Sequence, residues 1–419
     1  MKAIINANIY DYENYFENMY ILYDKKIIEI DKMKNFNKNC DIIDAKNSIV
    51  MPGFVNSHTH IYSTFARGLN IPFNPETFKE LLEQLWWKLD SKLTLESIYY
   101  SGLISSNEFI KNGVTTIIDH HASGEITNSL NTLKKAICDK SGLRGIFCFE
   151  TSDRFDVDKC IEENIEFSKN NSEKCSGIFG MHASITLSDN TLKKISNLTN
   201  LPIHIHVAES LEDEDDCIKN HQMRIIERLK KYDLIKNNSI LAHCIHIDEN
   251  EANLIKKSNS YIVLNPTSNM NNGVGLPDIQ MLQKRGIPLM LGNDGLGYNF
   301  AKDIQTLLFS MKHKYLNPLA FSIDDLKKII NTNFEYASKI LKIKLGKIKK
   351  DYVSDFLIVP YNSPTPMTKE NADGHIFYGV FDNFRPKTVI CNGKILKTNN
   401  EIYNESKKVS QKLWNKIQG

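Results

Sequence analysis

Residues 51–60 read MPGFVNSHTH, a short apolar run that ends in two histidines, His58 and His60. Successive side chains of a β-strand point to opposite faces, so residues two apart share a face. A strand over this stretch would therefore present both imidazoles on the same side. An HxH pair is a weak signal by itself, and its weight comes from the pattern that follows it.

Seven further stretches repeat this pattern of a short apolar run that ends in polar or ionisable residues. Stretches long enough for a helix lie between them, and in two of these, 94–112 and 220–232, apolar residues recur every three or four positions. Buried strands that alternate with helices are typical of a parallel sheet, and eight units predict a closed (β/α)8 barrel of the TIM type. The eight runs cover residues 50–60, 114–121, 143–150, 177–184, 202–209, 239–246, 261–268 and 288–295.

The two ends of the chain read differently from this repeating part. The N-terminal end shows strand-like alternation, and the C-terminal end contains further strand candidates, the hairpin signal Asn392-Gly393 and a helix pattern before residue 419. We predict that both ends together form a small β-sandwich domain with a C-terminal helix. The predicted division is 1–50 plus 346–419 for this domain and 51–345 for the barrel.

The composition excludes several classes of protein. The 419 residues carry 52 basic and 50 acidic side chains, a net charge of +2, so we expect no nucleic-acid partner. The first residues lack the apolar segment of a signal peptide, and no stretch approaches the ~18 apolar residues of a membrane span, so we expect no membrane partner. Eight cysteines without paired spacing favour free thiols in a reducing cytoplasm.

Histidine and carboxylate side chains gather at the ends of the predicted strands, where barrel enzymes carry their chemistry. The first run ends in His58 and His60, the fifth contains His206, and the eighth contains Asp294. His204 lies one layer deeper than His206 and is expected to be structural. Three imidazoles and a carboxylate suit Zn²⁺ or Fe²⁺ and leave one position for water. The alternative is a set of core histidines with an unrelated loop aspartate, and the coincidence at strand ends favours the metal.

Five motifs extend this pattern in order over residues 50–300. They are PGFVNSHTH at 52–60, HVAES at 206–210, LAHCIH at 241–246, NPTSNM at 265–270 and LGNDG at 291–295. With them the chain resembles the amidohydrolase superfamily, in its branch of purine, pteridine and triazine deaminases and chlorohydrolases. That branch is also expected to carry a flanking β domain.

The resemblance implies a metal site and the residues that surround it. The implied ligands of one divalent metal, Zn²⁺ before Fe²⁺, are His58, His60, His206 and Asp294. Binuclear relatives bridge two metals with a lysine at the end of the fourth strand, and the run 177–184 contains none, so a single metal is expected.

The same resemblance implies catalytic roles. Glu209 would be the acid and base that protonates a ring nitrogen, and His243 would orient or polarise the attacking water. Asp294 would take the proton of that water.

Substrate contacts are expected from the ends of other strands and from the long segment after the first strand. The residues predicted to contact the substrate are His182, Arg67, Glu150, His121 and Trp86. The sequence leaves open whether His120 replaces His121, whether Trp87 replaces Trp86, and whether Arg154 contacts the substrate instead of Glu150.

Three functions fit these residues. The first is hydrolytic deamination of an aminated nitrogen heterocycle, such as an oxidised purine or a pteridine, by water activated on the metal. The second is ring opening of a cyclic amide or ureide at the same centre. The third is a metal-binding scaffold without catalysis in purine breakdown. A homodimer is common among the relatives, but the sequence shows no interface.

Overall fold

The computed structural model describes residues 1–419, and its central strands form two parallel sheets of four and five strands. The first sheet has the order β6 (Phe54–Thr59), β7 (Val114–His121), β8 (Arg144–Phe149) and β9 (Cys175–Gly177). The second has the order β10 (Phe179–Ala183), β11 (Ile203–Val207), β12 (Ile240–His243), β13 (Tyr261–Leu264) and β14 (Leu289–Leu291). Eight of these strands fall in the eight predicted runs, and β9 precedes the fourth run, with which it shares only Gly177.

The two parallel sheets meet at both edges. A parallel bridge joins Thr59, at the end of β6, to Asp294 beyond β14, and a second joins Thr151 beyond β8 to Met181 in β10. Apart from Tyr261 at the start of β13, every residue of these strands is buried, as the continuous apolar runs predict.

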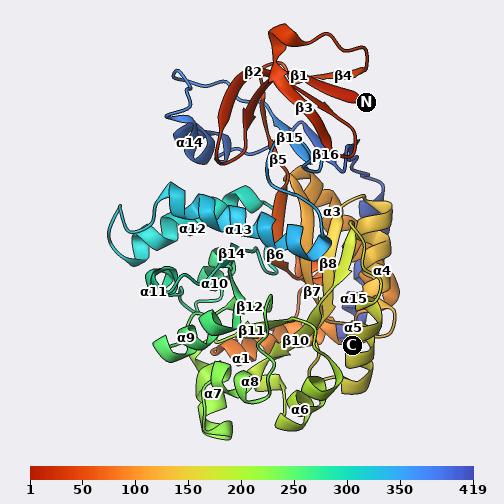
Figure 1. The fold of residues 1–419 in the computed structure, drawn as a ribbon. Coiled ribbons are helices and arrows are strands. Elements are labelled where there is room, and N and C mark those ends of the chain that lie inside the picture. The colour runs from red at the N-terminus through yellow and green to blue at the C-terminus, as the bar shows by residue number, and fades with distance from the viewer.

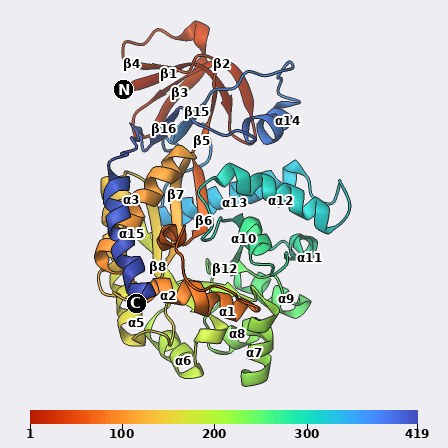
Figure 2. The same cartoon turned by 180° about the vertical axis from the view of Figure 1, so that it is seen from behind.

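Helices cover the outside of these sheets (Figures 1 and 2). The longest helix between two parallel strands is α3, and Thr94 caps its start, because the side chain of Thr94 accepts from the backbone N–H of Ser97 in a capping box.

 
The φ of Gly113 is 76°, in the left-handed region that glycine adopts without strain, so this residue ends the helix and turns the chain into β7. The covering helices are α3 (Leu95–Lys111), α4 (Ser129–Lys134), η4 (Lys135–Lys140), α5 (Val157–Ser168), η5 (Ser184–Thr186), α6 (Asp189–Leu198), α7 (Leu211–His221), α8 (Ile225–Lys231), α9 (Glu249–Ser258), α10 (Pro266–Asn271), α11 (Ile279–Lys284), α12 (Phe300–Lys314) and α13 (Ile323–Leu341).

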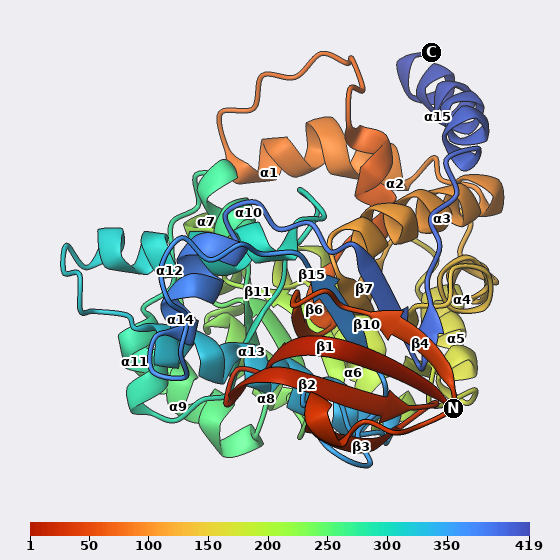
Figure 3. The same ribbon diagram turned by 90° about the horizontal axis from the view of Figure 1, so that it is seen from above.

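The segment after β6 forms a separate helical arm, which Figure 3 shows from above as the orange elements α1 and α2. It consists of η2 (Ile61–Ala66), α1 (Phe78–Leu81), the π-helical turn η3 (Leu82–Trp86) and α2 (Trp87–Asp90). Thr77 caps α1, because its side chain accepts from the backbone N–H of Glu80.

Both chain ends contribute to an eight-stranded mixed sheet. All eight strands belong to one hydrogen-bonded sheet, so the two stacked sheets implied by a β-sandwich are not observed. Strand β1 is nine residues long, and its one edge pairs first with β4 and then with β5, which have four residues each. The strands are β1 (Lys2–Tyr10), β2 (Tyr15–Tyr23), β3 (Ile27–Lys32), β4 (Asp41–Asp44), β5 (Ile49–Pro52), β15 (Phe356–Val359), β16 (Thr388–Cys391) and β17 (Lys394–Ile395).

The remaining elements tie the chain ends to the rest of the molecule. The predicted turn at Asn392-Gly393 joins β16 to β17, and both residues have positive φ, as a tight hairpin requires. The C-terminal helix α15 lies beside α3 (Figure 2), and its Trp414 Nε1 donates to the carbonyl of Phe65 at 2.7 Å. The other short helices are η1 (Met33–Asn35), α14 (Ala372–Gly374) and η6 (His375–Val380), and α15 covers Ile402–Gln418.

The chain passes from the mixed sheet into the first parallel strand at Gly53. A Cβ atom at this position would lie 2.3 Å from the side chain of Thr115, so only glycine fits between β5 and β6. No helix combines the length and the apolar content that crossing a lipid bilayer would require.

Candidate active site

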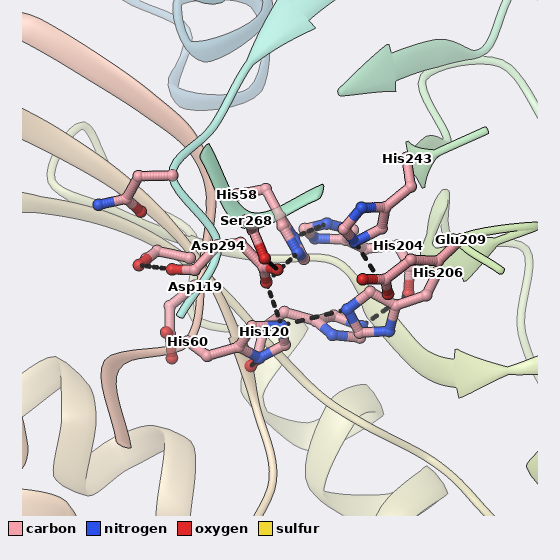
Figure 4. Close-up of polar contacts among 12 residues, drawn as sticks. His58, His60, Asp119, His120, His204, His206, Glu209, His243, Ser268 and Asp294 are labelled. Carbon is pink, nitrogen blue, oxygen red and sulfur yellow. Dashed lines mark hydrogen bonds and ion pairs between the residues drawn. The ribbon is translucent and has the colours of Figure 1, made fainter. Parts of the chain in front are cut away.

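Four side chains from three strand ends converge at the mouth of the parallel strands (Figure 4). They are His58 and His60 from the end of β6, His206 from β11 and Asp294 from the loop after β14. One ligand atom from each lies within 4.8 Å of the others, and all four residues are buried. We call these residues the four-residue cluster.

The distances between the side-chain atoms of the cluster are short enough for these atoms to bind a common metal ion. Asp294 Oδ1 lies 3.2 Å from His58 Nε2 and 3.0 Å from His60 Nε2, and the Nε2 atoms of His60 and His206 are 3.1 Å apart. Two imidazole nitrogens at that distance repel unless a proton or a cation lies between them.

Local structure brings these side chains together. Alternation along β6 places His58 and His60 on one face, as the sequence predicts. The backbone of Asp294 has a φ of 55°, and its N–H donates to the carbonyl of His58 at 3.1 Å. Gly292 allows this close approach, because a Cβ there would lie 2.8 Å from the Cβ of His58. Positive φ at a non-glycine residue stores backbone strain, which is common at functional sites.

The cluster fits one divalent cation. Three imidazole nitrogens and one carboxylate oxygen match the ligand set of mononuclear zinc or iron sites, in which water takes a further position. His58 Nε2 is fully buried without a hydrogen bond of good geometry, although Asp294 is close. A buried nitrogen of this kind is satisfied by coordination to a metal.

The charged groups of the cluster shift one another's pKa values. Burial raises the pKa of Asp294, but His58 and His60 outweigh it and hold that pKa well below its usual range. Burial lowers the pKa of His60, but Asp294 and Glu150 outweigh it and raise the pKa to about 9. Burial lowers the pKa of His58 to about 3. The metal-free cluster therefore holds an anionic Asp294 beside a protonated His60, whose proton a cation would displace.

Each imidazole of the cluster has a hydrogen-bond partner behind it. The Nδ1 atom of His60 lies 2.7 Å from the carbonyl of His120, and that of His206 lies 2.9 Å from the carbonyl of His182. The Nδ1 atom of His58 lies 2.9 Å from His204 Nε2. Bonds of this kind fix the tautomer of a metal ligand, so that Nε2 stays free for the metal.

Glu209 and His243 lie next to the cluster. Their ligand atoms and that of Asp294 lie within 4.8 Å of one another, and Glu209 Oε2 is 3.4 Å from His243 Nε2. Burial raises the pKa of Glu209. A raised pKa favours the protonated form of a carboxyl group, which can deliver its proton to a substrate.

A cavity opens directly beside these residues. The helical arm forms one wall of the cavity, and the ends of β10 and β11 form the opposite wall. The predicted residues His182, Glu150 and Trp86 line it, and Trp87 lines it as well. The other lining residues are His60, Tyr62, Phe78, Lys79, Leu82, Asp90, Ala183, Ile185, His206, Glu209, Ser210, Glu212, Asp213, Ser268, Asn272, Asp294, Gly295 and Leu296.

Two predicted substrate contacts lie outside the cavity. The buried ring of His121 packs against Tyr62 and Phe149, because adjacent residues at the end of β7 point to opposite faces. His120 points the other way, and its Nδ1 atom lies 2.9 Å from Glu150 Oε1 beneath the cluster. The side chain of Arg67 is exposed and lies over the ring of Tyr298 at 5.3 Å.

The wall of the cavity that the helical arm forms was not predicted in full. Phe78, Leu82, Trp86 and Asp90 all line the cavity, and they recur every four residues. This spacing was a readable signal, since side chains four apart lie on the same face of a helix.

Arg154 contacts the cavity wall indirectly. Its guanidinium forms two hydrogen bonds to the Asp90 carboxylate, at 2.6 and 3.0 Å, and lies over the ring of Trp87 at 4.6 Å. Of the two residues left open by the sequence, Glu150 lines the cavity and Arg154 supports one of its walls.

Comparison with known proteins shows which family and which relatives this chain resembles. The model of the Amidohydrolase family matches residues 49–396. The 5'-deoxyadenosine deaminase of Methanococcus maripaludis (strain C7) is 31% identical over 392 residues, which cover 89% of this chain and 88% of the relative. The 5'-deoxyadenosine deaminase of Methanocaldococcus jannaschii is 30% identical over 395 residues, with 90% of each chain covered.

Solved structures share the fold at lower identity. Guanine deaminase from C. acetobutylicum with bound guanine has a TM-score of 0.80 and 21% identity, and the match covers 94% of this chain and 100% of that one. An adenosine deaminase from Xanthomonas campestris with bound zinc has a TM-score of 0.81 and 17% identity, with 99% and 98% covered.

Proposed function

We propose that this chain, which belongs to the amidohydrolase family, hydrolytically deaminates an aminated nitrogen heterocycle and releases ammonia. The observation that carries the proposal is the position of Glu209. Its buried carboxyl group lies between the cavity and the four-residue cluster, where it can reach both a ring nitrogen and a water molecule. The curated relatives named 5'-deoxyadenosine deaminases support the same reaction class.

The four-residue cluster would hold one divalent cation, and we propose Zn²⁺ before Fe²⁺. When bound, the cation lowers the pKa of a water molecule toward neutrality and so supplies a nucleophile. The three imidazoles leave Asp294 as the only carboxylate of the cluster. Its Oδ2 atom accepts from Ser268 at 2.6 Å, which fixes the orientation of the carboxylate plane.

The neighbouring side chains would move the protons of the reaction. Asp294 accepts a proton from the attacking water, and Glu209 donates one to the ring nitrogen beside the carbon that carries the amino group. His243 Nε2, which faces Glu209, can accept a hydrogen bond from the attacking water and so orient it. Asp294 would then pass the proton taken from water to the amino group, which leaves as ammonia, and the hydroxyl proton of the addition product would return to Glu209.

The cavity supports a flat, neutral substrate that offers N–H donors. Trp86, Trp87 and Tyr62 supply apolar surfaces for a ring, and carboxylates of the lining outnumber its one lysine, Lys79. An anionic substrate would be repelled by this lining. We therefore propose a purine or a related heterocycle, with 5'-deoxyadenosine and guanine as the first candidates.

The architecture that carries this site is proposed to be a closed (β/α)8 barrel with a smaller domain from both chain ends. The bridges Thr59–Asp294 and Thr151–Met181, which join the two parallel sheets at both edges, support closure. The mixed sheet that pairs β5 with β1 and β15 supports the smaller domain.

A product assay tests the proposed reaction. Zinc-loaded protein is incubated with 5'-deoxyadenosine, adenosine, guanine, a pteridine and a cyclic ureide, and ammonia and product masses are measured. We expect ammonia from at least one aminated ring. A ring-opened product without ammonia, or no reaction with any substrate by fully loaded protein, would contradict the proposal.

Variants of two glutamates complete the assay. Glu209→Gln keeps the shape of the side chain but cannot cycle a proton, so it should bind metal normally and lose at least ~10²-fold in kcat. Glu166→Gln, an exposed position on α5, is the matched control and should retain the wild-type rate. Equal rates for the two variants would remove the assignment of Glu209.

A further inference from the structure

The short helix α10 contacts all three residues to which the proposed function gives a proton-transfer or polarising role. Ser268 Oγ donates to Asp294 Oδ2 at 2.6 Å, and Asn269 Oδ1 lies 2.8 Å from His243 Nδ1. Asn272, which follows the last residue of the helix, donates from Nδ2 to Glu209 Oε1 at 3.3 Å. Residues of this helix and the residue after it therefore form hydrogen bonds to Asp294, His243 and Glu209, which follow or belong to three different strands.

The sequence of α10 explains this arrangement. Pro266 occupies the first turn, where its missing N–H costs no hydrogen bond, and starts the helix directly after β13. Ser268 and Asn272 are four residues apart, so both face the cavity, and Asn272 Nδ2 also reaches Ser268 Oγ at 3.3 Å. Asn269 points away from the cavity toward His243.

The contact between Asn269 and His243 is isolated from solvent. Both side chains are fully buried. Asn269 Oδ1 is the one hydrogen-bond partner of the His243 ring, because His243 Nε2 has none and faces Glu209. His243 also has a φ of 71°, a strained conformation for a non-glycine residue, so the ring is held in place by its surroundings.

We propose that Asn269 is a positioning residue that keeps the proton of His243 on Nδ1. An amide oxygen can only accept, so a hydrogen bond from Nδ1–H leaves the lone pair of a neutral ring on Nε2, on the side of Glu209 and the four-residue cluster. The other tautomer would place a hydrogen on Nε2 and leave the buried oxygen of Asn269 without a donor. The inference rests on the proposed function for its catalytic consequence but not for the tautomer itself.

Nuclear magnetic resonance of protein labelled with ¹⁵N-histidine tests the tautomer directly. The signals of His243 are assigned from their loss in His243→Gln, and spectra are recorded at a pH where the ring is neutral. We expect Nδ1 to be the protonated nitrogen in the wild type and in Asn269→Asp, whose carboxylate oxygen also accepts. In Asn269→Leu, which keeps the branching at Cγ but removes the acceptor, the Nδ1–H form should no longer dominate.

The kinetic consequence is measured on the substrate found for the wild type. Asn269→Leu should lower kcat at least about tenfold with little change in KM, because losing the correct tautomer of a catalytic histidine impairs the reaction and not the binding. Asn269→Asp should recover a large part of this loss, since Asn269 Nδ2 has no partner that the substitution would remove. Asn271→Leu, at an exposed position of the same helix, should retain the wild-type kcat.

Three results would overturn the proposal. The first is an Nε2–H tautomer in the wild type, and the second is an unchanged tautomer in Asn269→Leu. The third is a kcat of folded Asn269→Leu equal to that of Asn271→Leu. If Asn269→Leu does not fold, the spectra of the wild type and of Asn269→Asp still show which nitrogen of His243 carries the proton. A chain that deaminates no heterocycle but shows the expected tautomer would contradict the proposed function and leave the assignment of the proton intact.

Discussion

Each imidazole of the four-residue cluster uses Nε2 for the common centre and Nδ1 for a hydrogen bond behind it. The sequence predicted His58, His60, His206 and Asp294 as a set. The alternation of side chains along a strand and the recurrence of histidine and aspartate at the strand ends can both be recognised in the sequence alone. The groups that form hydrogen bonds with the Nδ1 atoms of these histidines could not be recognised in this way. His204 was expected to be only structural, and its bond to His58 depends on the spacing between β6 and β11, which no sequence pattern reports.

His204 should therefore control how tightly the cluster binds its metal. We expect His204→Leu, which removes the acceptor behind His58, to weaken zinc binding about 10–100-fold in competition with a chromophoric chelator. His204→Gln should recover part of the affinity, because its amide oxygen can accept from the same nitrogen. An affinity of His204→Leu equal to that of the wild type would show that the bond is incidental.

Metal binding should also depend on pH in a defined direction. The pKa of His60 is raised to about 9 in the metal-free protein, so this ring carries a proton at neutral pH. A cation must displace that proton, since only a neutral imidazole is a ligand. The apparent affinity for zinc should therefore fall about tenfold for each pH unit below 9, as one displaced proton requires. Titrations at several pH values check this, and an affinity that is constant or rises on acidification would contradict it.

At the scale of elements, the positions of the strand ends could be predicted from the sequence, but the fold of the helical arm could not. The eight runs located β6 to β14 because buried parallel strands leave continuous apolar stretches. The four-residue spacing of Phe78, Leu82, Trp86 and Asp90 gives the arm one readable face, but the arm also contains a π-helical turn, and its fold over the site follows from tertiary contacts. Two of the predicted substrate contacts do not line the cavity: His121 lies on the far face of β7, and Arg67 lies over Tyr298.

The arm is held to the strands by the ion pair between Arg154 and Asp90. Asp90 is almost fully buried, and burial raises its pKa to about 6 although Arg154 lowers it. We expect Arg154→Met to loosen the arm, because an unpaired buried carboxylate costs about 3–5 kcal/mol. The measurable result is a higher KM with a smaller change in kcat and a lower unfolding temperature. Wild-type values of both KM and unfolding temperature would contradict this role.

At the scale of the whole molecule, the parallel and mixed sheets are joined by a buried ion pair. Arg144, at the start of β8, forms two hydrogen bonds to Asp355 before β15, and the backbone N–H of Asn392 donates to the same carboxylate at 2.7 Å. Both charged side chains are buried. The sequence showed that both chain ends form strands, but not that one arginine connects them to the catalytic part.

Removing one partner of this pair should destabilise the whole chain. Arg144→Met leaves Asp355 buried without its cation, and we expect the free energy of unfolding in denaturant to fall by about 3–5 kcal/mol. The double variant Arg144→Met/Asp355→Leu should recover much of this loss, because no unpaired charge remains. A single variant with an unchanged unfolding midpoint would show that the two sheets are joined by other contacts.

The central claim is that one cation binds among His58, His60, His206 and Asp294 beside Glu209. Anomalous scattering from crystals of the zinc-loaded protein tests it most directly. The account predicts one peak for each chain, about 2.0–2.2 Å from three Nε2 atoms and a carboxylate oxygen of Asp294. A cluster that stays free of metal in the presence of excess zinc, or a cation bound only elsewhere, would contradict it.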